Sequence, residues 1–330
     1  MDSTRIVIAG ASSLLGTELK SLLEESRFAA ADFRLLDEEI AAGTITEAGG
    51  EAAVIQPVEE DSFNHANLIF FSGSANFTAA NLKLALGSGA KVIDLSGMKA
   101  EREASSPWFP QLPGKALNFT GGEKMFSVLS APAACSALLS LALKPLALKN
   151  LSITHFRSVS EAGREGIEEL ESQTAKLLSM QPAGSSVFGT QVAFNLLDSC
   201  GPESKSDLRA AADSIQHQIS QAIDGFSLIP AINLIQAPFF YGAGFSALAE
   251  LDPAVDSAKL SQACRDAGFR IFKKTEGPLG TLTAAGEEFM FLSEPQPDPS
   301  RPGLWWFFGA ADNIRLPAFN AVKLAEKLFP

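Results

Sequence analysis

Short apolar runs alternate with segments of helical periodicity along the first third of the chain. The run "TRIVIAG" is rich in β-branched residues and ends in glycine, and "ASSLLGTELKSLLEES" after it repeats its apolar positions at helical spacing. "FRLLDEE", "NLIFFSGS" and "KVIDLSG" are typical of further strands, with a helix expected in "NFTAANLKLALGSGA" between the last two. This alternation predicts an α/β fold with a doubly wound parallel sheet of the Rossmann type.

Beyond residue 150 the pattern becomes richer in strands. "LSITHFRSVSEAGREGIEELESQTAKLL" predicts a strand, a turn and an amphipathic helix, and "DLRAAADSIQHQISQAI" predicts another helix. Strands are expected in "LIPAINLIQAPFF", "GAGFSALAELD" and "RPGLWWFFGAADNIR". The last segment, "LPAFNAVKLAEKLFP", predicts a helix whose apolar face packs against another element. A second domain of α+β type is therefore expected.

The turn between the first strand and helix has the spacing of a dinucleotide-binding turn. Such turns carry glycine at the first, middle and last positions, for the tight turn, the approach of the pyrophosphate and helix packing. Gly10 and Gly16 fill the first and last positions, and Ser13 replaces the middle glycine. Its side chain crowds a pyrophosphate, although its hydroxyl can donate to phosphate. Ser12 and Leu14 complete the candidate segment, because free N–H groups at a helix N-terminus bind anions.

Two other strand ends add candidate cofactor-binding residues. Asp37 and Glu38 follow the second strand at the interval where an acidic residue binds a ribose 2′-hydroxyl, which favours NAD and repels the 2′-phosphate of NADP. A solvated acidic turn is the alternative. Ser72 and Gly73 lie at the carboxyl end of a later strand, where parallel sheets bind ligands, and a plain turn of small residues is the alternative.

Composition and net charge limit the kinds of partner and the cellular compartment that we expect for this protein. A net charge of −12 argues against a nucleic acid or an anionic membrane as partner, because an acidic surface repels both. We expect no signal peptide or membrane-spanning segment, because no basic region precedes a long apolar stretch. The cysteines are three in number and far apart, which is typical of a reducing cytoplasm. No spacing of cysteines or histidines indicates a metal site.

Cys135 opens an apolar helical run, "LSAPAACSALLSLALKPL", and is the main catalytic candidate. A helix N-terminus lowers the pKa of a cysteine and makes it reactive. A free cysteine among small apolar residues is also a common buried side chain. We expect the sulfur to point into the packing between helix and sheet, and the functional thiol remains the alternative.

The chain resembles the aspartate-semialdehyde dehydrogenase family over nearly its whole length. The resemblance is closest to the Usg-like branch, whose members lack the usual nucleophile. It implies a nucleotide-binding domain at residues 1–130 plus 315–330, and an α+β dimerisation and former substrate domain at residues 131–314. A homodimer is implied, with pairing to an active relative as the alternative. The landmarks are "GASSLLGTEL", "KVIDLSG", "SAPAACSALLSLALKPL", "SVSEAGREGIEEL", "QVAFNLL", "QAPFFYGAGFSA" and "ADNIRLPAFNAVKLAE".

The resemblance also implies where the family's reactive residues fall. Family chemistry uses a cysteine thiolate, a histidine base, an orienting glutamine and arginines that bind carboxylate or phosphate. The altered positions are Ala134 for the nucleophile, Ala243 for the base, Gln236 for the substrate arginine, Arg157 for the glutamine, and Glu38 and Ile40 for the groups that hold the 2′-phosphate. Cys135 lies one residue late, which on a helix means about 100° of rotation and about 1.5 Å of rise.

Three hypotheses follow from these positions. The favoured one is a dimeric binding or partner protein of the family that has lost the parent activity. The second is an active semialdehyde dehydrogenase, or another NAD(P)-dependent oxidoreductase, with Cys135 as a displaced nucleophile. The third is a relative that has lost the cofactor as well, so that neither NAD nor NADP binds. In each, Arg157 either binds an anion or forms an internal ion pair with Glu161.

Overall fold

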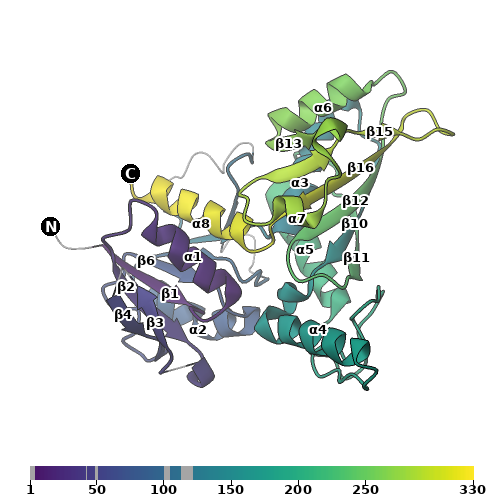
Figure 1. Ribbon diagram of the computed structural model, residues 1–330. Coiled ribbons are helices and arrows are strands. Elements are labelled where there is room, and N and C mark those ends of the chain that lie inside the picture. Colours follow the sequence, from purple (N-terminus) through teal and green to yellow (C-terminus); the bar gives the residue numbers. More distant parts are fainter. Residues whose placement is uncertain (1–3, 42, 49–50, 100–104, 113–121) are drawn as a thin grey trace. The chain divides into compact units, whose positions relative to one another are not determined.

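The computed structural model describes residues 4–41, 43–48, 51–99, 105–112 and 122–330 (Figure 1). The chain divides into two compact units. The first comprises Met1–Ser130 and Pro317–Pro330, and the second comprises Ala131–Leu316.

The first unit is built on a parallel sheet with the strand order β5-β2-β1-β6-β7-β9-β8. Every described pair of neighbouring strands in this sheet is parallel. Such strands are buried on both faces and are apolar throughout, which is the pattern of "RIVIA" and "LIFF". The strands are β1 (Arg5–Ala9), β2 (Asp32–Asp37), β5 (Gln56–Pro57), β6 (Leu68–Phe71), β7 (Lys91–Asp94), β8 (Ser106–Trp108) and β9 (Met125–Val128).

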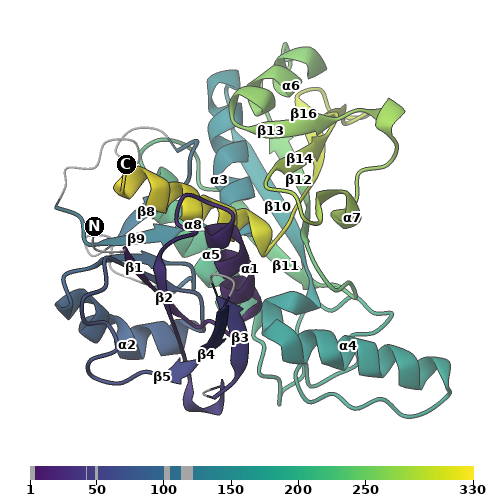
Figure 2. The same ribbon diagram turned by 60° about the vertical axis from the view of Figure 1, so that its left-hand side comes forward.

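Helices cover both faces of this sheet. Helix α1 (Leu14–Glu24) and the C-terminal helix α8 (Arg315–Leu328) share one apolar core, in which Leu19 and Leu324 are both fully buried (Figure 2). Helix α2 (Ala75–Gly87) packs through Phe77 and Ala85 into the core on the other face. The predicted doubly wound parallel sheet is therefore confirmed. A hairpin of β3 (Ile45–Ala48) and β4 (Glu51–Val54), with a 3₁₀ turn at Glu39–Ala41 before it, was not expected.

The second unit contains a mixed sheet with the order β11-β10-β12-β16-β14-β13, and β15 pairs with β16. Residues that alternate along β10 and β12 are buried on one face and more exposed on the other, as in a sheet covered on one side. The strands are β10 (Asn150–Arg157), β11 (Ala231–Gln236), β12 (Ala243–Glu250), β13 (Phe269–Phe272), β14 (Met290–Ser293), β15 (Gln296–Pro297) and β16 (Leu304–Ala311).

The buried face of this mixed sheet carries α3 (Ala131–Leu143), which packs against β10 and β12 as well as against two further helices (Figure 2). Those two are α5 (Leu208–Ile223) and α6 (Ser257–Asp266). Nearly every residue of α3 is buried, because the helix is apolar on all sides. The remaining helices are α4 (Gly163–Leu178) and α7 (Thr281–Ala284), and single 3₁₀ turns lie at Lys144–Leu146, Val159–Ala162 and Lys274–Glu276.

Candidate functional site

Glycines hold together two turns at the carboxyl edge of the parallel sheet. Gly10 has a φ of +93°, and a Cβ on this residue would lie 2.1 Å from the backbone nitrogen of Gly73. A Cβ on Gly16 would lie 2.3 Å from the carbonyl oxygen of Gly10. Both glycines of the first turn are therefore required by close backbone packing, as in a dinucleotide-binding turn.

Ser13 is the N-cap of α1 and directs its hydroxyl into the turn. The hydroxyl accepts a hydrogen bond from the Gly16 N–H at 2.8 Å and donates to the carbonyl oxygen of Ser72 at 2.8 Å. The Ser72 hydroxyl in turn donates to the Gly10 carbonyl oxygen at 3.1 Å. Leu14 is the first residue of α1. The side chain that was expected to crowd a pyrophosphate therefore links the two turns and caps the helix.

Asp37 ends β2 and fixes the same turn from the other side. One carboxylate oxygen accepts from the Ser12 N–H at 2.7 Å, and the other accepts from the Glu38 N–H at 2.9 Å. Asp37 is buried, whereas Glu38 is exposed. The two carboxylates therefore lie at the end of β2 with one held rigidly and one in solvent. Ile40, the other expected position of the phosphate-binding loop, has a side chain outside the described part of the structure.

The preference for NAD expected from Asp37 and Glu38 stays a prediction, with which the geometry at the end of β2 is compatible. A carboxylate oxygen has a second lone pair, so Asp37 can still accept from a ribose hydroxyl. A 2′-phosphate at the same place would meet two negative charges. The pyrophosphate fits less well, because the Ser12 and Gly16 N–H groups already donate to side chains of the protein.

Asp94 is a buried acid at the same sheet edge that the pattern analysis did not single out. It ends β7, and one carboxylate oxygen accepts from the N–H and the hydroxyl of Ser96 at 2.9 and 2.6 Å. The other oxygen is buried and has no hydrogen-bond partner among the described residues. Burial raises the pKa of Asp94 to about 6, although the bonds from Ser96 oppose this shift. The sequence shows the motif "KVIDLSG" that contains Asp94, but it does not show that this carboxyl is buried.

Cys135 and Ala134 lie side by side in the first turns of α3, and both are fully buried. Burial raises the pKa of the Cys135 thiol to about 12, so the thiolate is scarce at neutral pH. The expected burial of the sulfur is therefore confirmed. The alternative interpretation expected the helix N-terminus to lower the pKa of Cys135, and this pKa is raised instead.

The residue after the cysteine forms a buried polar pair with a histidine of the underlying sheet. The Ser136 hydroxyl lies 2.8 Å from Nε2 of His155 on β10. The imidazole also packs against the ring of Phe245, at 5.5 Å between centroids, and its Nδ1 has no hydrogen-bond partner in the part of the chain that the structure describes. Burial lowers the pKa of His155 to about 3, so the ring is neutral at physiological pH. This pair fastens α3 to β10 and offers no exposed base.

Strand register brings three of the altered family positions into one row. Arg157 at the end of β10 pairs with Gln236 of β11 on one side and with Ala243 of β12 on the other. Neighbours in register point to the same face of a sheet. The three positions at which the resemblance predicts altered reactive residues therefore lie at adjacent points of a single row.

Arg157 is half-buried and bonds only to neutral acceptors within the described residues. Its guanidinium donates to the Ser206 hydroxyl at 2.6 Å, to the backbone carbonyl of Glu161 at 3.1 Å, and weakly to the Gln236 amide oxygen at 3.5 Å. The Glu161 carboxylate instead accepts from the Asn313 side chain at 2.9 Å. The internal ion pair between Arg157 and Glu161 is therefore wrong, because Asn313 holds that carboxylate.

The arrangement limits the chemistry that the described residues can perform. Covalent addition to an aldehyde needs a thiolate that a substrate can reach, and proton transfer needs an accessible base. The buried Cys135 and the buried His155 supply neither. A guanidinium without a carboxylate partner can still bind an anion.

A Rossmann-type unit with a mixed-sheet second unit is an architecture found among two-domain nucleotide-dependent dehydrogenases. Two family descriptions match the chain more specifically. "Semialdehyde dehydrogenase, NAD binding domain" matches residues 5–105, and "Semialdehyde dehydrogenase, dimerisation domain" matches residues 138–316. The chain belongs to the semialdehyde dehydrogenase family.

Individual relatives agree with this assignment. The chain is 31% identical to the USG-1 protein homolog of Pseudomonas aeruginosa and 28% identical to that of Azotobacter vinelandii, in each case over 98% of this chain and 97% of the relative. It is 27% identical to a solved structure of a probable aspartate-semialdehyde dehydrogenase from Pseudomonas aeruginosa, with a TM-score of 0.86 over 99% of this chain and 98% of the other. The expected family and its Usg-like branch are confirmed.

Among the described residues, no helix combines the length and the apolarity needed to cross a bilayer.

Proposed function

We propose that this protein is a non-catalytic, dimeric member of the semialdehyde dehydrogenase family that acts as a binding or partner protein. The observation that carries the proposal is that the cysteine of α3 is buried and is not a reactive thiolate. This single cysteine of the helix is fully buried, with a pKa of about 12, and the residue before it is alanine. An enzyme of this chemistry instead needs a thiolate within bonding distance of an aldehyde carbon.

The row of altered residues supports the same proposal. Alanine at position 243 has no atom that can accept a proton, and His155 is buried and neutral. A displacement of about 1 Å in a catalytic group costs roughly 10²-fold in rate. The offset of Cys135 by one helical position is larger than that. Arg157 remains as the residue that binds an anionic group of a ligand.

We further propose that the nucleotide-binding unit prefers NAD to NADP. The rigid Asp37 carboxylate and the neighbouring Glu38 favour a ribose diol over a ribose phosphate. The occupied N–H groups of Ser12 and Gly16 weaken the pyrophosphate site, so we expect modest affinity. The partner in the dimer is a second copy of this chain, and pairing with an active relative is the alternative.

The activity test uses the purified protein with aspartate semialdehyde, phosphate and either dinucleotide. We expect no change in NADH or NADPH absorbance above that of the buffer. The matched variants are Cys135→Ser and Cys200→Ser. Turnover by the wild type and by Cys200→Ser, together with its loss in Cys135→Ser, would make Cys135 a displaced nucleophile and overturn the proposal.

Thiol labelling tests the state of Cys135 without any substrate. Cys200 is partly exposed, whereas Cys135 and Cys264 are buried and burial raises the pKa of each to about 12. We expect iodoacetamide to modify Cys200 first, and the two buried thiols only at the rate at which the protein opens. Rapid labelling of Cys135 that NAD blocks would contradict a purely structural thiol.

Calorimetry with each dinucleotide tests the nucleotide preference. We expect NAD to bind at least tenfold more tightly than NADP, and the pair Asp37→Ser with Glu38→Arg to reduce or reverse that ratio. Equal affinities for NAD and NADP would contradict the assignment of Asp37. Binding of neither would support loss of the cofactor while leaving the non-catalytic proposal intact.

A further inference from the structure

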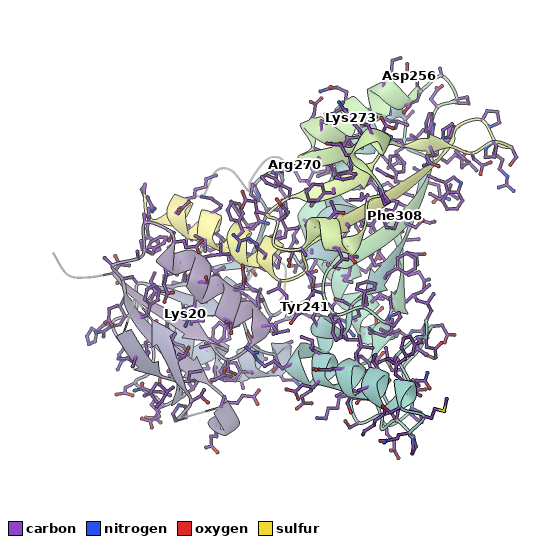
Figure 3. All side chains as sticks on the ribbon, viewed as in Figure 1. Lys20, Tyr241, Asp256, Arg270, Lys273 and Phe308 are labelled. Carbon is purple, nitrogen blue, oxygen red and sulfur yellow. The ribbon has the colours of Figure 1, made fainter. Side chains whose placement is uncertain are left out.

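The second unit has a surface groove that shares no residue with the candidate site. The groove has a volume of about 410 Å³ and runs beside β13. Figure 3 labels Arg270 on this strand and Lys273 directly after it. The lining residues are Arg265, Phe269, Arg270, Ile271, Phe272, Glu276 and Phe291.

The groove follows the free edge of a sheet. Strand β13 is the last strand in its sheet and pairs only with β14. All four residues of β13 line the groove, although successive side chains of a strand point to opposite faces. What these four residues have in common is their backbone, so the groove runs along the outer backbone edge of β13. Four residues at about 3.3 Å each span roughly 13 Å. Within the described residues, no hydrogen bond joins this outer edge to another element.

The charged residues that line the groove are two arginines and one glutamate, although the chain as a whole is strongly acidic. Arg265 is exposed, and no hydrogen bond or ion pair of its guanidinium is found within the described residues. Arg270 stacks on the Phe289 ring, with its guanidinium carbon 3.1 Å from the centroid, and forms a long ion pair with the Glu287 carboxylate at 4.0 Å. The Glu276 carboxylate accepts from the Lys273 N–H at 2.7 Å, a backbone bond that adds no opposing charge. Arg265 is therefore the guanidinium of this lining that a carboxylate of a partner can pair with.

Taken with the unpaired backbone, this charge indicates one kind of occupant. A peptide that adds to a sheet edge gains main-chain hydrogen bonds, and its alternate side chains contact the flanking residues. A second copy of β13 would bring no carboxylate to this edge, because the strand contains Arg270 and no acidic residue. We propose that the edge of β13 binds an extended acidic segment of another protein, with Arg265 facing its carboxylates.

The test uses the full-length protein and a fluorescent hexapeptide, Glu-Val-Glu-Val-Glu-Val, with blocked ends, followed by fluorescence anisotropy. This peptide places its glutamates on one face of a strand. We expect saturable binding that weakens roughly tenfold in Arg265→Glu, because one attraction becomes a repulsion. The matched control is Arg209→Glu, an exposed residue of α5 with the same change in charge and outside the groove, which should bind as the wild type does.

Peptide variants separate strand addition from simple charge attraction. N-methylation of alternate residues removes backbone donors, and we expect it to abolish binding while the charges remain. Hydrogen exchange of the Phe269–Phe272 amides should slow when the unmodified peptide is bound. The proposal is overturned if the N-methylated peptide or a lysine analogue binds equally well, or if Arg265→Glu and Arg209→Glu behave alike.

A small-acid control excludes a different source of the carboxylates. N-acetylglutamate should displace the peptide only at concentrations at least a hundredfold above the peptide dissociation constant. Displacement at equal concentration would identify a site for a small acid and overturn strand addition. None of these outcomes depends on catalysis, so they are independent of the activity test above.

Discussion

A buried acid at the end of β7 makes the first unit sensitive to pH. One oxygen of Asp94 has no hydrogen-bond partner within the described ranges, and burial raises the pKa of this carboxyl from 3.8 to about 6. Below pH 4 the acid is neutral in both the folded and the unfolded chain. Between pH 4 and 6 the unfolded chain ionises first, so the free energy of unfolding falls as the pH rises. Above pH 6 the loss is constant, at about 3 kcal/mol.

The variant Asp94→Asn tests this residue. Asparagine does not titrate, and its oxygen can keep the bonds from Ser96, so we expect its stability relative to the wild type to rise by about 3 kcal/mol between pH 4 and 7. Urea unfolding at several pH values measures the difference. The exposed Asp61→Asn serves as the control. If the free energies of unfolding of Asp94→Asn and the wild type differed by the same amount at pH 4 and pH 7, the buried-acid interpretation would be wrong.

At the scale of elements, local periodicity was enough to predict most of the framework. Strand β1, helix α1 and the succession of β10 and α4 lie where their apolar positions predict them, because each buries one face locally. The hairpin of β3 and β4 was missed. Its strands have four residues each and lack a clear alternation of apolar and polar side chains.

Contacts within the candidate site could not be read from the same pattern. The bond between Asp37 and the Ser12 N–H joins residues 25 positions apart, and the Ser136–His155 pair depends on how α3 lies on β10. Strand β11 lies beside β10 although 73 residues separate their ends, Arg157 and Ala231. The row of altered positions therefore emerges only from strand order. Periodicity reports which face is buried, not which element covers it.

Helix α4 holds the following loop through two buried side chains. Gln173 accepts from the N–H groups of Val192 and Ala193 at 2.8 and 3.0 Å, and donates to the Gly184 carbonyl at 2.9 Å. Glu169 accepts from the N–H groups of two other loop residues. Buried backbone groups of the loop are thus satisfied by side chains of α4 instead of by secondary structure.

Replacing Gln173 should release this loop. Gln173→Ala leaves several buried backbone groups without partners, and we expect a loss of about 2–4 kcal/mol in the free energy of unfolding. Cleavage by a nonspecific protease should quicken at residues 184–193. Glu171→Ala, on the exposed side of the same helix, is the matched control and should change neither quantity. Unchanged cleavage in Gln173→Ala would show that the apolar contacts of Val187 and Phe188 suffice.

At the scale of the whole molecule, the face of the mixed sheet opposite α3 carries large apolar side chains that are partly exposed among the described residues. Leu248 of β12 pairs in register with Trp306 of β16, and Ser246 with Phe308, so these side chains share the face opposite α3. Trp306 is 44% exposed. Figure 3 labels Phe308 on the same strand. Since residues 138–316 match a dimerisation domain, this exposed row is the surface that we test as the interface.

Two copies of the chain would bury this row against each other about a twofold axis, because a twofold interface uses the same patch on both subunits. A glutamate at its centre would then face its own symmetry mate or apolar surface, and either costs several kcal/mol of association energy. We therefore expect Trp306→Glu to convert a dimer into a monomer while the far-ultraviolet circular dichroism stays unchanged, as sedimentation velocity can measure. The control is Ile45→Glu, which changes a 74% exposed apolar residue in the first unit and should leave the dimer intact. A wild-type monomer, or a Trp306→Glu dimer of unchanged affinity, would show that the open sheet face is not the interface.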